Sequence, residues 1–321
     1  MGIINMRKSR VAVLDIGSNT IMLLLASCDK TGHIDILNEY GAVVNLGETL
    51  YSEKYLAEKT MLQAAELCYE IVQIAKSEGA EKIIVTVSSS LKLAINISEF
   101  LVLLQSKINI FPHMLTANEE KNHIFNGAMN DYTNIKGRPI ILIEIGSSET
   151  FLIYGTEDIV VGSYNFDIGS YKALKHSRER SYMFFNNKSL TPLLKSVIKK
   201  PLKDVKRWLD AREPIILCSG STPSIYASIA SNKGNCTREY INSYKGSVKG
   251  LSTLYKELIK MSLEERFTIP GLEKERVETF PVNVFILNKM LKWLGYENFN
   301  VTTNGLRTGI LKSFFENNER I

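Results

Sequence analysis

Long apolar runs are missing from this sequence of 321 residues, because no stretch of about 18 consecutive apolar residues occurs in it. The opening MGIINMRKSR also lacks the apolar stretch of a secretory signal. Gly2 invites a myristoylation reading, but Met6 stands where that motif requires Ser or Thr. We therefore expect no membrane association and a cytoplasmic location.

Closely spaced cysteines are missing as well. Cys28, Cys68, Cys218 and Cys236 lie far apart, and none has a histidine at metal-ligand spacing. The four histidines of the chain form no pattern to which a role can be assigned. The sequence therefore favours neither a disulfide framework nor a zinc site, and it is typical of a protein from a reducing compartment.

A strong charge of either sign is the third absence. The net charge of +5 is modest for this length, so it suits anionic ligands without indicating a nucleic-acid partner. Hydrophobic residues make up 45% of the chain and charged residues 23%, which excludes a mostly disordered protein. The length favours two domains.

One pattern is present twice. VLDIGSNTIMLLL at 13–25 places an acid at the end of an apolar strand, crosses a turn of small polar residues and becomes apolar again. LIEIGSSETFLIY at 142–154 repeats that order. Because each copy predicts a strand, a turn and an antiparallel strand, we expect two similar α/β halves, with a boundary near Phe125.

The remaining pattern alternates strands with helices, which is typical of an α/β protein. In the first half we expect strands at 11–14, 21–26, 34–37, 82–87 and 108–115, helices at 61–75 and 95–105, and a helix start at 116–120. In the second half we expect strands at the start of 215–224 and of 299–311, and a Lys-rich helical region at 186–212 interrupted at Pro201.

Small residues follow a strand at four places, where backbone N–H groups could approach an anion closely. We predict phosphate-binding roles for Gly17, Ser18, Asn19, Gly146, Ser147, Ser148, Gly220 and Ser221. Asn304-Gly305 is the fourth place. Taken one at a time, each is also explained as a tight turn, but two copies with an acid at the same offset favour the phosphate hypothesis.

The acids of the two copies are Asp15 and Glu144. A carboxylate beside a phosphate would repel it unless a cation lay between them, so this pair predicts a magnesium ion or another divalent cation. The alternative is that each acid caps its own turn. Glu119 and Glu120 could supply a base that takes a proton from an attacking water, although solvated helix starts explain them too.

A run of basic residues lies in the Lys-rich region. It comprises Lys195, Lys199, Lys200, Lys203, Lys206 and Arg207. These residues could track a long anionic chain, and the alternative is a solvated helix face.

Seven segments resemble one known family in their order along the chain. They are VLDIGSNTIMLLL, SSSLKLAINISEFL, LTANEEKNHIF, ILIEIGSSETFLIYG, FDIGSYKAL, CSGSTPSIYA and VTTNGLRTGIL. Together they resemble the exopolyphosphatase and guanosine pentaphosphate phosphohydrolase (Ppx/GppA) family, in its short two-domain form. The resemblance implies two actin-like, ribonuclease-H-like (ASKHA) domains with the active site in an interdomain cleft. The first would be 1–125, with a helix at about 305–321 packing back on it, and the second 126–304.

The resemblance also implies roles for single residues. Asp15 and Gly17 to Asn19 match the first phosphate loop, Glu120 matches the carboxylate that activates water, and Lys92 stands where the family usually has a phosphate-binding arginine. The second loop departs from the family's Asp-Ile-Gly-Gly-Gly-Ser-Thr-Glu. Glu144 lengthens the acid, and Ser147 and Ser148 replace glycines.

The predicted function is that of a magnesium-dependent exopolyphosphatase that releases terminal phosphate from polyphosphate. Guanosine pentaphosphate is the alternative substrate. A non-catalytic sensor of a phosphate-rich ligand is a second class, and a kinase of the same fold is a third. The partner we expect is the phosphate-rich ligand, and a homodimer is an assembly that the sequence leaves open.

Overall fold

The chain forms two compact units. A computed structural model describes residues 9–29, 33–132, 135, 137–178, 187–232, 234 and 236–318. Unit 1 comprises Met1–Asn130 together with Leu306–Ile321, and unit 2 comprises Asp131–Gly305. The division follows helix α4, which runs on past Phe125 to Ala128.

Over its described residues, unit 1 contains one sheet in the order β3-β2-β1-β4-β5. Strands β1 and β2 are antiparallel, and β1 and β4 are parallel. The elements are β1 (Ser9–Ile16), β2 (Thr20–Cys28), β3 (Ile34–Val43), α1 (Leu50–Glu53), α2 (Glu58–Ser77), β4 (Lys82–Val87), the 3-10 helix η1 (Ser89–Leu93), α3 (Ile97–Ile108), β5 (His113–Met114), α4 (Ala117–Ala128), the 3-10 helix η2 (Met129–Asp131, its last residue in unit 2) and α12 (Leu306–Asn318).

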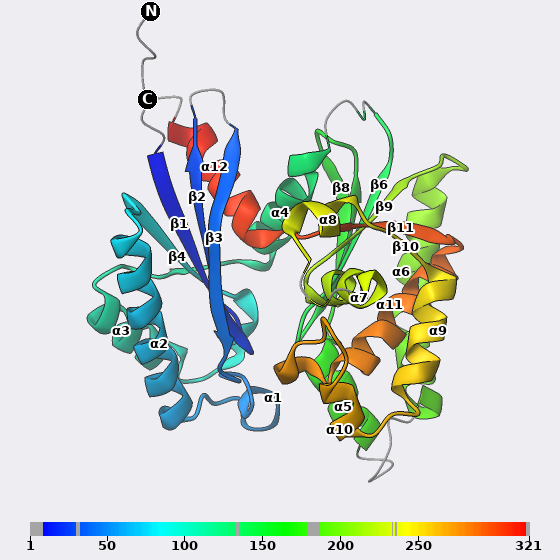
Figure 1. Ribbon diagram of the computed structural model, residues 1–321, viewed down its shortest axis with the longest axis horizontal. Coiled ribbons are helices and arrows are strands. Elements are labelled where there is room, and N and C mark those ends of the chain that lie inside the picture. The colour runs from blue at the N-terminus through cyan, green and yellow to red at the C-terminus, as the bar shows by residue number, and fades with distance from the viewer. Residues whose placement is uncertain are drawn as a thin grey trace, which may run out of the picture. The chain divides into compact units, whose positions relative to one another are not determined.

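Both faces of the unit 1 sheet are covered, as Figure 1 shows. Alternate residues of β1 point to opposite faces. Leu14 and its neighbours on that face pack with Cys68 of α2 and Phe100 of α3. Val13 packs on the other face with Leu311 of α12. The buried apolar run of the first strand therefore serves two hydrophobic layers.

Unit 2 contains a sheet in the order β10-β11-β9-β6-β7-β8 over its described residues. Its elements are β6 (Ile140–Ile145), β7 (Thr150–Gly155), β8 (Val160–Phe166), α5 (Ser170–Arg178), α6 (Asn187–Leu209), β9 (Ile215–Ser219), α7 (Ser221–Ser231), α8 (Arg238–Ser243), β10 (Lys245–Ser247), α9 (Val248–Leu258), α10 (Leu263–Phe267), the 3-10 helix η3 (Lys274–Arg276), α11 (Phe280–Leu294) and β11 (Asn298–Thr302).

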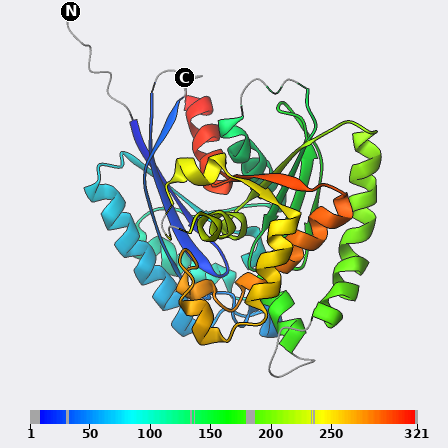
Figure 2. The same ribbon diagram turned by 45° about the vertical axis from the view of Figure 1, so that its right-hand side comes forward.

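A helical layer covers one face of the unit 2 sheet. Ile143 of β6 belongs to the same hydrophobic cluster as Ile198 of α6, Leu251 of α9 and Ile286 of α11. Helix α11 lies between α6 and α9 and contacts both (Figure 2).

The two sheets repeat one topology. The order β3-β2-β1-β4-β5 of unit 1 corresponds to β8-β7-β6-β9-β11 of unit 2, and β10 extends the second sheet. Each first pair is antiparallel, and each first strand is parallel to the strand that follows the hairpins. The predicted α/β class with two similar halves is confirmed.

Two local predictions are wrong. The strand expected at 108–115 is only His113–Met114, because α3 continues to Ile108 and uses the apolar residues before it. The expected interruption at Pro201 does not occur, since α6 runs through both Pro192 and Pro201. Ile198, Leu202 and Val205 are all buried, so packing along one face outweighs the lost backbone hydrogen bond.

All four cysteines are free, and three of them are buried. Among the described residues, no helix is both long enough and apolar enough to cross a membrane.

Candidate active site

The first candidate loop connects β1 to β2 in unit 1. The Gly17 N–H donates to the Thr20 carbonyl at 2.9 Å, which closes the turn. The Ser18 carbonyl accepts from the Gly47 N–H at 2.5 Å, and the Asn19 carbonyl accepts from the Val44 N–H at 2.8 Å. The segment that follows β3 therefore braces this loop through its carbonyl oxygens.

The second candidate loop connects β6 to β7 in unit 2 and forms the same turn. The Gly146 N–H donates to the Glu149 carbonyl at 2.8 Å. Its bracing comes from the start of α5, where the Ser170 N–H donates to the Gly146 carbonyl at 3.0 Å and the Tyr171 N–H to the Ser147 carbonyl at 2.9 Å. Ser148 is buried, whereas Gly146 is exposed.

The acids of the two loops occupy equivalent positions. Asp15 pairs with Thr86 of the parallel strand β4, and Glu144 pairs with Ser219 of the parallel strand β9. Both side chains are half-buried. The acid that precedes the turn in each copy of the sequence pattern thus occupies the equivalent position in the sheet of its own unit.

Glu120 lies in the first turn of α4. The helix starts with a capping box, in which the Thr116 side chain accepts from the Glu119 N–H and the Glu119 side chain accepts from the Thr116 N–H. This fixes the helix start and separates the two acids, because Glu119 faces outward to His113 at 3.0 Å, while Glu120 is only 4% exposed.

The buried Glu120 carboxylate is held by serines that follow β4. Its Oε2 accepts a hydrogen bond from the Ser89 hydroxyl. Burial raises the pKa of Glu120, and hydrogen bonds from Ser89 and Ser88 together with the charge of Lys92 oppose that rise. By contrast, hydrogen bonding by Thr116 lowers the pKa of Glu119 to about 2. The two neighbouring acids therefore differ in chemistry, and Glu120 is the one suited to accept a proton.

Unit 1 brings the first loop and Glu120 to the same end of its sheet. The Ile16 carbonyl, directly before Gly17, accepts from the Ser88 N–H at 2.9 Å. Ser89, the next residue, holds Glu120. The exposed Lys92 lies in the same short helix η1.

Unit 2 brings the other small-residue loops to Glu144. The Ser219 hydroxyl donates to Glu144 Oε2 at 2.5 Å. Gly220 has φ of +88°, and a Cβ there would lie 3.4 Å from Glu144 Cγ. A Cβ on Gly305 would lie 3.3 Å from Glu144 Oε2. Gly220 and Gly305 therefore lie close to one side chain, that of Glu144, at the carboxyl ends of β6, β9 and β11.

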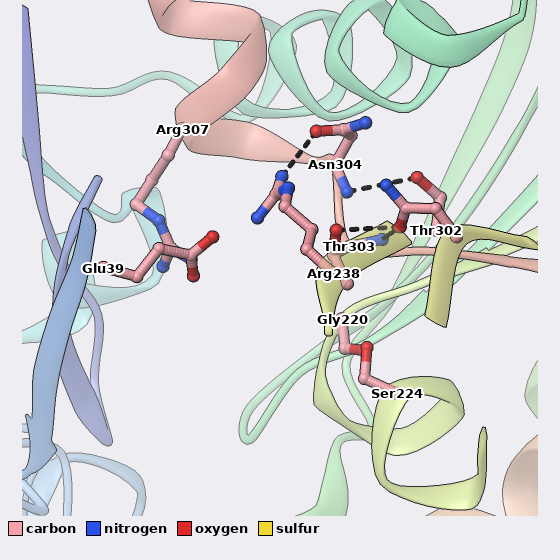
Figure 3. Close-up of polar contacts among 9 residues, drawn as sticks. Glu39, Gly220, Ser224, Arg238, Thr302, Thr303, Asn304 and Arg307 are labelled. Carbon is pink, nitrogen blue, oxygen red and sulfur yellow. Dashed lines mark hydrogen bonds and ion pairs between the residues drawn. The ribbon is translucent and has the colours of Figure 1, made fainter. Parts of the chain in front are cut away.

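A polar network fixes the end of β11 (Figure 3). Arg238 donates to Asn304 Oδ1 at 2.5 Å, and the Thr303 N–H donates to Asn242 Oδ1 at 2.7 Å. Asn304 and Asn242 also donate to Asp131 Oδ2, at 2.6 and 2.8 Å. Near it, the Ser224 hydroxyl donates to the Gly220 carbonyl at 3.0 Å. The network holds the segment before Gly305 in place.

No group of three or more His, Cys, Asp or Glu side chains that could hold a metal occurs in the part of the chain that the structure describes. A site that relies on several protein ligands, as zinc sites do, is therefore not formed by those residues. Asp15 and Glu144 are single carboxylates at strand ends. Each by itself is a ligand of the kind that magnesium takes, because this ion keeps several waters and usually binds one or two carboxylates plus substrate phosphates.

Sequence reasoning missed the contacts of Ser89 and Ser219. Each follows or ends the strand parallel to the first strand of its unit, and each donates to a candidate acid. The signal was present, because Ser88-Ser89-Ser90 comes directly after a buried strand, and carboxyl ends of parallel strands gather at one edge. Which acid each serine meets depends on tertiary packing.

Solved structures with similar folds cover nearly the whole chain. An exopolyphosphatase from Cytophaga hutchinsonii matches with a TM-score of 0.85 and 19% identity, covering 96% of this chain and 98% of that one. A Ppx/GppA family member from Aquifex aeolicus matches with a TM-score of 0.76 and 19% identity, covering 97% and 99%. At this identity the likeness establishes the fold.

The family is established by the sequence itself. Residues 26–318 match the Ppx/GppA phosphatase family. The chain therefore belongs to that family.

Proposed function

We propose that this protein is an exopolyphosphatase, which uses water to release the terminal phosphate of polyphosphate. The observation that carries the proposal is Glu120, a buried carboxylate whose pKa is raised and whose position is fixed by Ser89. A base with these properties can take a proton from water near neutral pH, which its exposed neighbour Glu119 is poorly suited to do.

In this mechanism Glu120 accepts a proton from water as the water oxygen forms a bond to the terminal phosphorus. The bond from that phosphorus to the bridging oxygen breaks, and the electron pair leaves with the shortened phosphate chain. The N–H groups of Ser18 and Asn19 in unit 1 and of Ser147 and Ser148 in unit 2 are proposed to hold phosphate oxygens, and Lys92 adds a positive charge. Gly17 and Gly146, whose N–H groups close the turns, let the backbone approach the phosphate closely. Gly220 and Ser221 are proposed to contribute in the same way at the start of α7.

Asp15 and Glu144 are the residues we propose to hold a magnesium ion. When bound, such an ion neutralises the developing charge on the phosphate oxygens. Ser219 keeps Glu144 oriented through its hydrogen bond of 2.5 Å.

Guanosine pentaphosphate is the alternative substrate, because it presents the same kind of terminal phosphoanhydride. A second function, ligand sensing without turnover, is favoured by the second loop. There Ser148 is buried, and serines stand in the first and second positions after Gly146. A loop altered in this way could bind phosphate without stabilising its transfer.

The test measures phosphate released by the purified protein from polyphosphate and from guanosine pentaphosphate, each with magnesium. We expect release from polyphosphate and its loss in Glu120→Gln by roughly 10²- to 10⁴-fold. Glu119→Gln is the matched control, since glutamine preserves the capping box, and it should keep most of the activity.

Other outcomes assign the alternatives. Faster release from guanosine pentaphosphate would make that the substrate. Binding of polyphosphate without release, unchanged in Glu120→Gln, would identify a sensor. Transfer that requires a second, phosphate-accepting substrate would identify a kinase.

A further inference from the structure

The surface of unit 2 carries a cluster of lysines on two neighbouring helices. We call it the α6–α11 basic surface, and it consists of Lys195, Lys199, Lys203, Lys206, Lys289 and Lys292. Figure 2 shows α6 and α11 side by side, and the two helices are in contact.

Four of the lysines of α6 lie along one side of the helix. Lys195, Lys199 and Lys203 follow each other at a spacing of four residues, and Lys206 comes three residues later, so their side chains share a face. All four are exposed. From Lys195 to Lys206 the helix rises by roughly 17 Å. The face is therefore long enough for several consecutive charged groups of an extended polymer.

Helix α11 adds its lysines to the same area. The pKa of Lys289 is lowered by burial and by the positive charges of Lys292 and Lys195, which places the three side chains near one another. Lys206 approaches the end of α11, since a Cβ on Gly295 would lie 3.7 Å from Lys206 Nζ. The lysines of both helices thus form one surface.

Within the two helices, the described residues supply one carboxylate against these lysines. Helix α11 contains no Asp or Glu, and Asp204 on α6 accepts from the Tyr164 hydroxyl at 3.1 Å and pairs with Arg207 at 3.4 Å. No carboxylate contributes to the lowered pKa of Lys289. Glu213 follows α6 and raises the pKa of Tyr296 beyond the end of α11, so it lies at the edge.

Helix α2 shows the ordinary arrangement. There the helix carries Lys59 and Lys76 together with Glu58, Glu66 and Glu70. Like charges brought together repel one another and lower stability, and a bound anion removes that cost.

The chemistry of the cluster indicates what it binds. Lysine ammonium groups act as point charges that meet phosphate oxygens without the fixed geometry of arginine. Binding of single-stranded nucleic acid usually adds aromatic side chains on which bases stack. The tryptophans of these helices, Trp208 and Trp293, instead pack against the hydrophobic core.

We propose that the α6–α11 basic surface binds the chain of a long inorganic polyphosphate, away from the phosphate that is hydrolysed. This inference rests on polyphosphate being the substrate, as proposed above. It assigns these lysines a role in holding long chains and none in the bond-breaking step.

The experiment compares affinities for long-chain polyphosphate and for tripolyphosphate, measured by calorimetry without divalent cations so that the polymer stays intact. The variant is Lys195→Gln/Lys199→Gln/Lys203→Gln. The control is Lys59→Gln/Lys76→Gln/Lys82→Gln, which removes the same charge from exposed positions of unit 1.

We expect the α6 variant to bind long-chain polyphosphate about tenfold more weakly and with a smaller dependence on salt, because fewer counterions are released. Binding of tripolyphosphate should change little, and the control variant should bind both ligands as the unaltered protein does. Equal weakening in the two variants, or none in either, would overturn the inference. Tighter binding of a single-stranded oligonucleotide of equal charge would overturn it too and would assign the surface to nucleic acid.

The experiment distinguishes failure of this inference from failure of the proposed function. Long-chain binding that depends on these lysines, in a protein that releases no phosphate, would leave the surface established and the hydrolase refuted. Phosphate release from long chains, together with an unchanged affinity for them in the α6 variant, would support the hydrolase and refute the binding surface.

Discussion

The loops after β1 and β6 share a turn but differ in how they are built into their units. Each begins with a glycine whose N–H donates to the carbonyl three residues on, at 2.9 Å for Gly17 and 2.8 Å for Gly146. The third residue is half-buried Asn19 in the first loop and buried Ser148 in the second. A shared backbone motif therefore carries two different side-chain environments.

The two copies of the repeat therefore place their acids at equivalent positions, but the side chains at those positions differ in length and in hydrogen bonding. The two acids keep equivalent places in the sheets, yet Glu144 is longer than Asp15 and its Oε2 accepts from Ser219 at 2.5 Å. The first loop lies at the same sheet end as Glu120, and the second follows Glu144, which lies beside Gly220 and Gly305. In the proposed mechanism unit 1 supplies the base Glu120, and unit 2 contributes phosphate-binding loops.

Replacing the two acids gives the largest expected contrast. Asp15→Asn should lower phosphate release by roughly a hundredfold, and Glu144→Gln by about tenfold, because the glutamine can still accept from Ser219. Rates measured over a range of magnesium concentrations check this. Equal losses in the two variants would break the proposed asymmetry.

The segments that brace the loops give the second contrast. A Cβ on Gly169 would lie 2.4 Å from the Ser147 carbonyl oxygen, whereas a Cβ on Gly47 would lie 2.8 Å from the Ser18 Cβ. Gly169→Ala must therefore displace backbone, and it should reduce the free energy of unfolding by about 2–4 kcal/mol, against about 1–2 kcal/mol for Gly47→Ala. Urea denaturation of both variants measures the difference. A larger loss for Gly47→Ala would contradict this account of the bracing.

The buried Glu120 should reveal itself in the pH dependence of stability. Because burial raises its pKa, the folded protein binds this proton more tightly than the unfolded chain, so stability falls as pH rises from the ordinary value of 4.5 through the raised one. Glu120→Gln removes the ionisation and should be more stable than the unaltered protein at neutral pH. Melting temperatures of both proteins test this sign, measured from about pH 4, close to the ordinary carboxylate pKa, to about pH 8. A variant that is less stable at pH 7 would contradict it.

The smallest expected effect is on the pH profile of activity. The Ser89 hydrogen bond lowers the pKa of Glu120, so Ser89→Ala should move the acidic limb of the rate profile to higher pH. Ser106→Ala is the control, because its exposed hydroxyl donates to the Leu103 carbonyl at 2.7 Å within α3. An acidic limb that stays in place in Ser89→Ala would show that this serine does not tune the base.

Much of the fold was predictable because its signals are local. The hairpin at Gly17 and its copy at Gly146 combine apolar strands with small turn residues, and both are confirmed. The continuous helix through Pro201 was not predictable in the same way, since the buried face at Ile198, Leu202 and Val205 forms only against the rest of unit 2. At Pro201, tertiary packing therefore outweighs the tendency of proline to interrupt a helix.

The candidate site likewise combines features that local sequence predicts with features that depend on tertiary packing. Strand ends and small residues indicated the candidate loops, and the carboxylates Glu119 and Glu120 indicated the start of α4. The burial of Glu120 beside the outward Glu119, and the serines that contact Glu120 and Glu144, depend on contacts between distant segments. Sequence spacing alone could not distinguish the two neighbouring acids.

The central claim is that Glu120 activates water for attack on a terminal phosphate, and isotope labelling tests it most directly. The protein is incubated with polyphosphate and magnesium in ¹⁸O-labelled water, and the released phosphate is analysed by mass spectrometry. We predict one labelled oxygen in each newly released phosphate, with the rate of labelling nearly abolished in Glu120→Gln and retained in Glu119→Gln. Unlabelled phosphate, or labelling at the full rate in Glu120→Gln, would contradict the account.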